Sequence, residues 1–277
     1  MRGLIFGTPG IPLSTENSNT LNGIRKVKEL GLGAMELEFV RSINVSKEKA
    51  VEVKALAKKL GVILTCHGQY WVNLASKETT KVKASIERIV SAARRVHECG
   101  GWSATWHMGF YLGRDKKKVH NIIRKNLKTA LLRLEDEGVD LWIRPETTGK
   151  PTQWGDLDET ISLSQEFENV LPCIDYGHLH ARYNGANNTL EEFRGILSKL
   201  KDELGRRALD NMHIQCCGIE YSEKGERRHL NFEESDANWK DMLRSWKEFR
   251  IKGVVIPECP SVEGDALMLK RFFSRIG

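Results

Sequence analysis

Short apolar runs typical of β-strands recur along the whole chain, and the segments between them have helical spacing. The runs begin near positions 2, 34, 62, 102, 140, 170, 211 and 253. Apolar residues recur every three or four positions between them, as in residues 51–60, 86–96, 122–131, 190–200 and 239–249. Strict alternation of this kind requires a parallel sheet, and eight repeats in about 250 residues predict a closed (β/α)8 barrel. We therefore expect one α/β domain, a TIM barrel over residues 1–277.

The ends of the helical segments carry residues that commonly start or stop helices. Ser46 precedes one segment in the position of a side-chain N-cap. Glycines follow others, where a left-handed residue lets the chain leave the helix and enter a strand. These are Gly31, Gly61, Gly100, Gly138 and Gly253.

Composition excludes several classes of protein. The first apolar run is too short for a signal peptide, and no stretch approaches the length of a membrane span, so we expect a cytoplasmic protein. The six cysteines form no Cys-x-x-Cys pair, which argues against a zinc ribbon or a disulfide scaffold. A net charge of +6 is only weak support for a nucleic-acid partner.

Potential metal ligands stand at the ends of six of the apolar runs. In a (β/α)8 barrel the C-terminal ends of the strands meet at the active-site face, so these side chains should converge. Three carboxylates in such a place would repel one another unless cations lay among them. Imidazole and carboxylate without thiolate suits Zn²⁺, Mn²⁺ or Fe²⁺ better than Mg²⁺ or Ca²⁺. The six residues are His67, His107, Glu146, Asp175, His213 and Glu258.

Each ligand candidate also has a structural interpretation. Glu146 could pair with Arg144, and Asp175 could cap the following helix. A single histidine at a strand end is more often hydrogen-bonded than metal-bound. These explanations would all have to hold independently on one face of the barrel, which favours a metal site.

The remaining histidines divide into two groups. His178 becomes a second ligand candidate beside Asp175 if the chain turns from strand into loop there. His180 is expected to be structural, and His97 and His120 lie in helical segments away from the strand ends. The longest segment between predicted helices and strands is residues 220–235. Its charge indicates a solvated loop, which leaves the barrel at the ligand-bearing face.

Several motifs in succession resemble those of the endonuclease IV family, which consists of zinc-dependent apurinic/apyrimidinic endonucleases on xylose-isomerase-like barrels. The resemblance runs in order from the first strand to the last. Such collinearity is more specific than any single motif. The motifs are residues 67–74 (HGQYWVNL), 106–109 (WHMG), 145–149 (PETTG), 173–178 (CIDYGH), 212–213 (MH) and 257–260 (PECP).

The resemblance implies two or three zinc ions per chain, with Mn²⁺ or Fe²⁺ as alternatives. His67, His107 and Glu146 would hold the first ion, and Glu146 would bridge to a second. The second ion would also be held by Asp175, His213 and Glu258, and a third by His178 and His229.

The implied activity is hydrolysis of the DNA phosphodiester 5′ to an abasic site, in base excision repair. Glu146 and Glu258 would be catalytic, and Tyr70 would contact DNA at the lesion. A nucleotide without its base has little stacking to lose, so it is flipped most easily into a pocket. The partner would be double-stranded DNA containing abasic sites, without any membrane, and we expect a monomer.

Two departures from the family pattern make the chain a divergent branch. The third site ordinarily reads Asp-x-His, but here Arg227, which cannot ligate a cation, precedes Arg228 and His229. Either Glu226 or Glu223 replaces the missing carboxylate, or the Arg227 guanidinium holds the phosphate in place of a metal; we favour the second. That interpretation makes Arg227 catalytic and Arg228 a DNA contact.

The second departure lies after the second strand, where residues 36–41 (ELEFVR) replace an arginine–glutamine element that penetrates DNA. Arg41 partly takes over that role. Two other functions stay open. Glu146, Asp175, His213 and Glu258 alone would make the one-metal site of a sugar isomerase or epimerase, and the altered third site would also suit a catalytically impaired DNA-binding protein.

Overall fold

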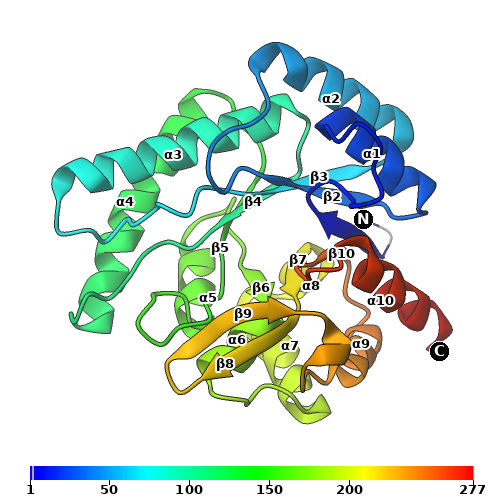
Figure 1. Cartoon of the computed structure of the whole chain (residues 1–277). Coiled ribbons are helices and arrows are strands. Elements are labelled where there is room, and N and C mark those ends of the chain that lie inside the picture. The colour runs from blue at the N-terminus through cyan, green and yellow to red at the C-terminus, as the bar shows by residue number, and fades with distance from the viewer. Residues whose placement is uncertain (2, 277) are drawn as a thin grey trace. The chain divides into compact units, whose positions relative to one another are not determined.

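The computed structural model describes residue 1 and residues 3–276 (Figure 1). Parallel strands alternate with helices along the chain, and a two-stranded hairpin is inserted late. The strands are β1 (Leu4–Pro9), β2 (Ala34–Glu38), β3 (Ile63–His67), β4 (Ser103–Trp106), β5 (Trp142–Pro145), β6 (Cys173–Asp175), β7 (Met212–Cys216), β8 (Gly218–Ser222), β9 (Gly225–Leu230) and β10 (Gly253–Pro257). The helices are α1 (Thr20–Glu29), α2 (Lys47–Leu60), α3 (Thr79–Glu98), α4 (Lys116–Asp136), α5 (Leu157–Glu166), α6 (Tyr176–Arg182), α7 (Leu190–Leu204), α8 (Arg206–Asp210), α9 (Trp239–Glu248) and α10 (Glu263–Arg275), with the 3-10 turn η1 (Phe232–Glu234).

Eight strands form one sheet in the order β5-β4-β3-β2-β1-β10-β7-β6. Apart from β1 and β10, which are the first and last strands of the chain, neighbours in this order are connected through helices, as parallel strands must be. The predicted fold class, eight β/α repeats of the TIM-barrel type, is confirmed. The eight predicted strand starts lie within three residues of the observed ones, and the largest error is at β6, expected near 170 and found at Cys173.

The chain divides into two compact units. The first contains residues 1–35, 149–151 and 173–277, and the second contains residues 36–148 and 152–172. Strand β2 passes from one unit to the other, because Ala34 and Met35 belong to the first and Glu36–Glu38 to the second. Whether the chain acts as the single domain expected from its sequence stays a prediction.

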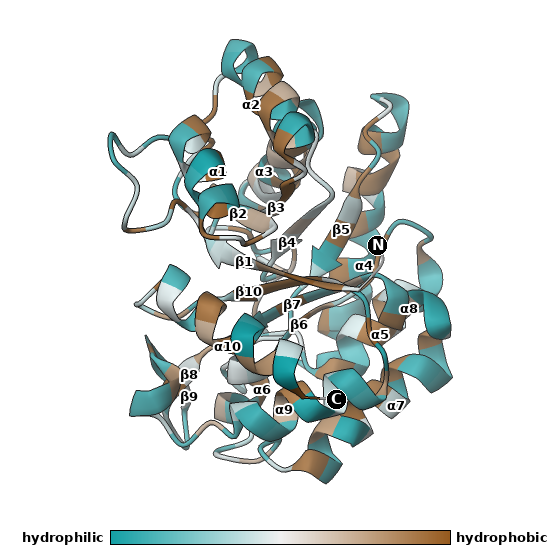
Figure 2. Cartoon of the chain, turned by 90° about the vertical axis from the view of Figure 1, so that its right-hand side faces the viewer, coloured by the Kyte–Doolittle hydropathy of each residue, from teal (hydrophilic) through white to brown (hydrophobic). Residues whose placement is uncertain are grey.

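In the first unit, β10 lies between β1 and β7, and β6 pairs with β7. The register places His213 beside both Cys173 and Val254. Both interior strands are buried throughout, but only β10 (GVVIP) is continuously apolar, because β7 (MHIQC) places His213 and Gln215 between apolar residues. Figure 2 shows β10 in brown, whereas much of α7 and α9 is teal.

In the second unit, β3, β4 and β5 are paired in parallel, and α3 packs against α2 and α4. The buried face of α3 is the predicted one: Ile86, Ile89, Val90, Ala93 and Val96 are all buried. Burial of this apolar stripe, not helix propensity alone, stabilises the helix.

The expected helix boundaries are largely confirmed. The Ser46 hydroxyl accepts a hydrogen bond from the Lys49 amide at the start of α2. Gly61 ends that helix in the left-handed conformation, with φ of 67°. The exception is Gly253, which begins β10 with φ of 139°, while Arg250 takes the left-handed position after α9 with φ of 49°.

Two expected loops are regular structure. Most of the segment predicted as a solvated loop, 220–235, is the antiparallel β8–β9 hairpin followed by η1. The chain after Asp175 enters α6 directly instead of a loop. Both segments pack together, because α6 contacts β8 and β9.

All six cysteines are buried and free. Among the described residues, no helix is both long and apolar enough to cross a membrane.

Candidate metal centre

The second unit brings two imidazoles onto one buried carboxylate. His67 ends β3, His107 follows β4 and Glu146 follows β5, so parallel pairing of the three strands aligns them. Glu146 is fully buried, with Oε1 2.7 Å from His107 Nε2 and Oε2 3.4 Å from His67 Nε2. One ligand atom from each residue lies within 4.8 Å of the others.

Hydrogen bonds orient this cluster. The Gly68 carbonyl can only accept, so His67 Nδ1 carries the proton of that 2.8 Å bond and Nε2 is left as the ligand atom. The Thr105 hydroxyl lies 3.3 Å from Glu146 Oε2 and donates to either that oxygen or the Arg144 carbonyl. A histidine fixed in one tautomer beside a supported carboxylate is typical of a metal site.

Arg144 has structural contacts of its own. Its guanidinium is buried, donates to Ser103 Oγ and the Pro172 carbonyl, and lies 5.0 Å from the Trp102 ring centroid. These contacts hold Arg144 in the packing around β4 and β5.

The loop after β3 presents Tyr70 beside the cluster. Its ring centroid is 5.6 Å from that of His67, and the residue is 58% exposed. The Tyr70 amide donates to the Val40 carbonyl at 3.0 Å, which brings the loop that carries exposed Arg41 alongside. Gly68 fits this loop because a Cβ there would lie 1.7 Å from Trp106 Nε1.

Two glutamates on β2, buried Glu36 and half-buried Glu38, were missed by sequence reasoning. Glu36 and Glu38 are two residues apart and therefore share one face of the strand. Burial raises the pKa of Glu38 well above its ordinary value, and the charges of Glu36 and Glu146 raise it further. The signal was available, since two acids in a five-residue buried strand are unusual.

In the first unit, Asp175 and His178 interact at the start of α6. Asp175 Oδ1 accepts from the His178 amide at 2.8 Å, and Oδ2 lies 3.4 Å from His178 Nδ1. Asp175 is therefore a helix cap as well as a ligand candidate, and the two interpretations are compatible. Both residues are buried.

His213 and Glu258 belong to neighbouring strands of the same unit. His213 is fully buried in β7, and Glu258 follows β10 with its amide bonded to the Cys216 carbonyl. Gln215 Nε2 donates to Glu258 Oε1 at 2.9 Å and fixes that carboxylate. Sequence reasoning missed Gln215, whose signal is a polar side chain within a buried strand.

The β8–β9 hairpin adds His229 and a carboxylate to this unit. His229 Nδ1 lies 3.0 Å from the Glu258 carbonyl, and its ring is 5.8 Å from that of His178. Glu226 Oε2 lies 3.1 Å from His178 Nε2. The pKa of His229 is lowered, first by burial and then by the charge of His178.

Arg227 lies on the exposed side of the hairpin. Its side chain is 63% exposed and pairs with Glu220 at 3.1 Å. Arg228 is also exposed and pairs with the same carboxylate. The hairpin carboxylate that lies beside His178 is that of Glu226, and the role of Arg227 toward a phosphate stays a prediction.

The other histidines have structural contacts. His180 is buried, with Nδ1 2.8 Å from the Ala186 carbonyl and Nε2 3.1 Å from Asp236. His97 lies in α3 beside the Asp140 backbone, and His120 lies in α4 near Ser162. These positions fit the non-ligand roles expected for all three.

The donor sets in both units fit divalent transition metals. Each combines imidazoles with buried carboxylates, and no thiolate takes part. His67 and His229 each donate a proton from Nδ1 to a carbonyl, which leaves Nε2 to ligate. Carboxylates buried at this depth are otherwise costly, so the arrangement suits bound cations.

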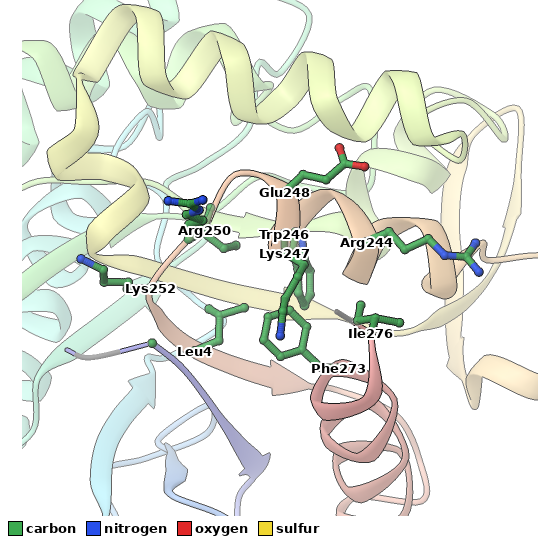
Figure 3. A pocket seen from close by; sticks show the side chains of 11 residues that line it. Leu4, Arg244, Trp246, Lys247, Glu248, Arg250, Lys252, Phe273 and Ile276 are labelled. Carbon is green, nitrogen blue, oxygen red and sulfur yellow. The ribbon is translucent and has the colours of Figure 1, made fainter.

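A separate pocket of about 610 Å³ lies at the opposite end of β10 (Figure 3). Lys252 precedes that strand and Glu258 follows it, so the pocket is remote from Glu258. Its lining includes Arg244, Trp246, Lys247, Arg250, Lys252 and Phe273, and none of these is a ligand candidate.

The chain belongs to the xylose isomerase-like TIM barrel family, whose sequence model matches residues 24–272. It is 40% identical over 273 residues to an uncharacterized protein of Methanocaldococcus jannaschii, covering 99% of this chain and 98% of that protein. It is also 26% identical over 213 residues to a probable endonuclease 4 of Mycoplasma pneumoniae, covering 73% of this chain and 69% of that one.

Solved structures with the same fold have different names. A D-tagatose 3-epimerase-like protein has a TM-score of 0.74 at 18% identity, covering 98% of this chain and 96% of its own. Endonuclease IV from Thermus thermophilus has a TM-score of 0.72 at 17% identity, covering 96% of this chain and 98% of its own. At these identities the likeness shows the fold alone, so the donor sets must carry the functional argument.

Proposed function

We propose that this protein is a metal-dependent endonuclease that hydrolyses the DNA phosphodiester 5′ to an abasic site. The observation that carries the proposal is the cluster of His67, His107 and Glu146 in the second unit. A one-metal sugar isomerase would use the carboxylates and His213 of the first unit and would not need this second, imidazole-rich set.

Sequence similarity supports the same activity. The similarity to the probable endonuclease 4 of Mycoplasma pneumoniae extends over 73% of this chain. The motifs that carry the ligand candidates occur in the order of the endonuclease IV family. The reaction class therefore rests on donor chemistry and motif order together, and not on the fold.

Zn²⁺ is the proposed ion, with Mn²⁺ and Fe²⁺ as alternatives, and when bound it would activate water and neutralise charge on the phosphate. His67 and His107 would hold it through Nε2, supported by Glu146. In the first unit, Asp175, His213 and Glu258 would hold another ion. Gln215 keeps the Glu258 carboxylate oriented by donating to it.

Contacts with DNA are proposed for the exposed residues near the donor sets. Tyr70 offers a ring to the lesion, and Arg41 and Arg228 offer charge to the phosphates. Trp71, next to Tyr70, is 59% exposed and enlarges the aromatic surface. We propose that the chain acts in the cytoplasm as a monomer on double-stranded DNA.

The test is incubation with a duplex that contains one tetrahydrofuran abasic analogue. Incision 5′ to the analogue is expected, with loss of incision on chelation and recovery on adding Zn²⁺ or Mn²⁺. An intact duplex of the same sequence is the control and should not be cut. Tight binding of the abasic duplex without incision under every metal would contradict the proposal and favour an impaired homologue.

A sugar epimerase is the second candidate. It is favoured by the donor set of the first unit, in which Asp175 and His213 lie on paired strands and Glu258 follows the next strand. Incorporation of deuterium from the solvent into ketohexoses, without incision of DNA, would establish this candidate instead.

A further inference from the structure

We infer that the pocket at the start of β10 binds a small organic phosphate, and we call it the basic pocket after its cationic residues Arg244, Lys247, Arg250 and Lys252. All of its lining belongs to the first unit and comes from the start of β1, from α9 and the turn after it, and from the end of α10 (Figure 3). Its volume of about 610 Å³ lies within the range of small-molecule sites, roughly 300–1,000 Å³. The inference goes beyond the proposed function and does not depend on it.

Positive charge predominates in the basic pocket. Among the described lining residues, Glu248 is the one acid that stands beside the four cations. Both of its carboxylate oxygens accept hydrogen bonds from Arg194 on α7, at 2.7 and 2.8 Å, so its charge is already compensated. Arg244 is paired as well, with Asp241 at 2.5 Å.

Two of the cations have no carboxylate partner. In the part of the chain that the structure describes, neither Lys247 nor Arg250 forms an ion pair. Lys247 Nζ lies 4.9 Å from the centroid of the Phe273 ring, and the Arg250 side chain is exposed. Lys252 pairs with Asp210 at 3.3 Å. An anion in the pocket would therefore meet two uncompensated positive charges.

The end of α9 does not oppose an anion. The last carbonyls of a helix carry partial negative charge and would repel one. Here the guanidinium of Arg206 donates to the carbonyl of Phe249 at 2.7 Å and also to the carbonyl of Arg250. These bonds cover the negative end of the helix with a cation, so the field of the four cationic side chains is not cancelled.

Arg250 stands at a backbone position that favours glycine. It follows α9 with φ of 49°, in the left-handed region. Its amide donates to the Lys247 carbonyl, and the Ile251 amide donates to the Trp246 carbonyl, which is the Schellman pattern of a helix end. The same pair of bonds ends α1, α3 and α4, where the left-handed residue is a glycine in each case: Gly31, Gly100 and Gly138.

This difference indicates a use for the Arg250 side chain. A left-handed backbone costs free energy for any residue with a Cβ, and glycine avoids that cost. A cation that served only solubility could stand at many unstrained surface positions. Strained residues are characteristic of functional sites, and this one carries a guanidinium without an ion-pair partner at the edge of a pocket.

The arrangement of the lining fits a phosphate joined to an apolar group. Figure 3 shows Arg250 and Lys252 toward one side of the pocket and Phe273 and Ile276 toward the other, with Leu4 between them. A guanidinium binds two phosphate oxygens at once, and an ammonium adds a point charge. A phosphate monoester carries a charge of about −1.5 to −2 near pH 7, which matches the two uncompensated cations. The half-buried apolar side chains would contact the organic part.

The test follows the methyl signal of Ile276 by NMR in the full-length protein with its metals, labelled at isoleucine methyl groups and assigned with Ile276→Val. This signal reports on the basic pocket, because a phosphate bound near Glu258 would lie at the other end of β10. Adenosine 5′-monophosphate and phenyl phosphate are titrated into the millimolar range. At least one should give a saturable shift, and its phosphate-free counterpart, adenosine or phenol, should bind at least about tenfold more weakly.

Arg250→Gly is the decisive variant, because it removes the guanidinium and also relieves the left-handed backbone. Its thermal midpoint should equal or exceed that of the wild type, while its affinity for the phosphate probe should fall about tenfold or more. Arg271→Gln is the control, since it removes an exposed arginine of α10 that lies outside the lining. It should leave the affinity unchanged.

Several results would overturn the inference. They are the absence of a shift with either phosphate, equal affinity of each phosphate and its phosphate-free counterpart, and equal affinity of Arg250→Gly and the wild type. Inorganic phosphate that binds as tightly as the organic probes would remove the role of the apolar wall. A shift caused by a short DNA duplex but by neither small phosphate would assign the pocket to nucleic acid instead.

The readout is independent of the proposed activity. If the titrations behave as expected but abasic DNA is never incised, the basic pocket stands and the endonuclease function fails. If incision is observed while Ile276 responds to neither phosphate, the function stands and the pocket assignment fails.

Discussion

At the scale of single residues, Glu146 is the side chain on which the second unit's donor set depends. It is fully buried and contacts both imidazoles. Glu146→Gln keeps its shape but removes its charge, so we expect loss of bound metal and a fall in incision rate on the order of 100-fold or more. Metal content and single-turnover incision measure the two effects.

The matched control is Glu135→Gln, which makes the same change at an exposed position of α4. It should change neither quantity. A Glu146→Gln protein with wild-type metal content and wild-type incision would remove the central support of the proposed function.

Substitution of Arg144 is expected to lower the stability of the fold and to leave the reaction chemistry unchanged. Its buried guanidinium bonds Ser103 and Pro172 and stacks with Trp102 and Trp142 at 5.0 and 5.3 Å. Lysine has no planar fork, so Arg144→Lys should lower the free energy of unfolding by about 2 kcal/mol or more. Urea unfolding measures this, and exposed Arg133→Lys should change stability by less than about 0.5 kcal/mol.

At the scale of elements, strand positions were predictable but the hairpin was not. Buried strands such as β10 (GVVIP) carry short apolar runs that stand out from the helical periodicity. The β9 strand has the polar sequence Gly225–Leu230, which carries no apolar signal. Its bulge places one extra residue in β9 between the pairs with Glu220 and Tyr221, and no local sequence pattern indicates it.

The capping box of α7 should make the molecule sensitive to acid. Glu192 accepts from the amides of Asn188 and Thr189, and these bonds, the Asn188 amide foremost, lower its pKa below the ordinary 4.5. A carboxyl group with a lowered folded-state pKa stabilises the fold above its unfolded pKa and loses that contribution as pH falls through the folded value.

The wild type should therefore lose stability more steeply than Glu192→Gln below about pH 4.5. Urea midpoints measured between pH 6 and pH 3 test this. Parallel curves for the two proteins would mean that the box contributes nothing measurable.

At the scale of the whole molecule, the sequence predicted which residues become ligand candidates but not how they are grouped. Motif order identified His67, His107 and Glu146, which the structure brings together. It could not reveal the division into two compact units, because that division depends on long-range packing. Local patterns predict elements, whereas the surroundings of a side chain are set by distant segments.

The salt dependence of ligand binding distinguishes the two candidate functions. The chain carries a net charge of +6, and binding DNA would release counterions from several phosphates. With two or more phosphates neutralised, affinity for a duplex with a non-hydrolysable linkage 5′ to the abasic analogue should fall at least about tenfold between 50 and 200 mM salt. A neutral sugar releases no counterions, so its binding should hardly change. Fluorescence anisotropy of the labelled duplex measures the slope, and salt-independent DNA binding would count against a phosphate-reading surface.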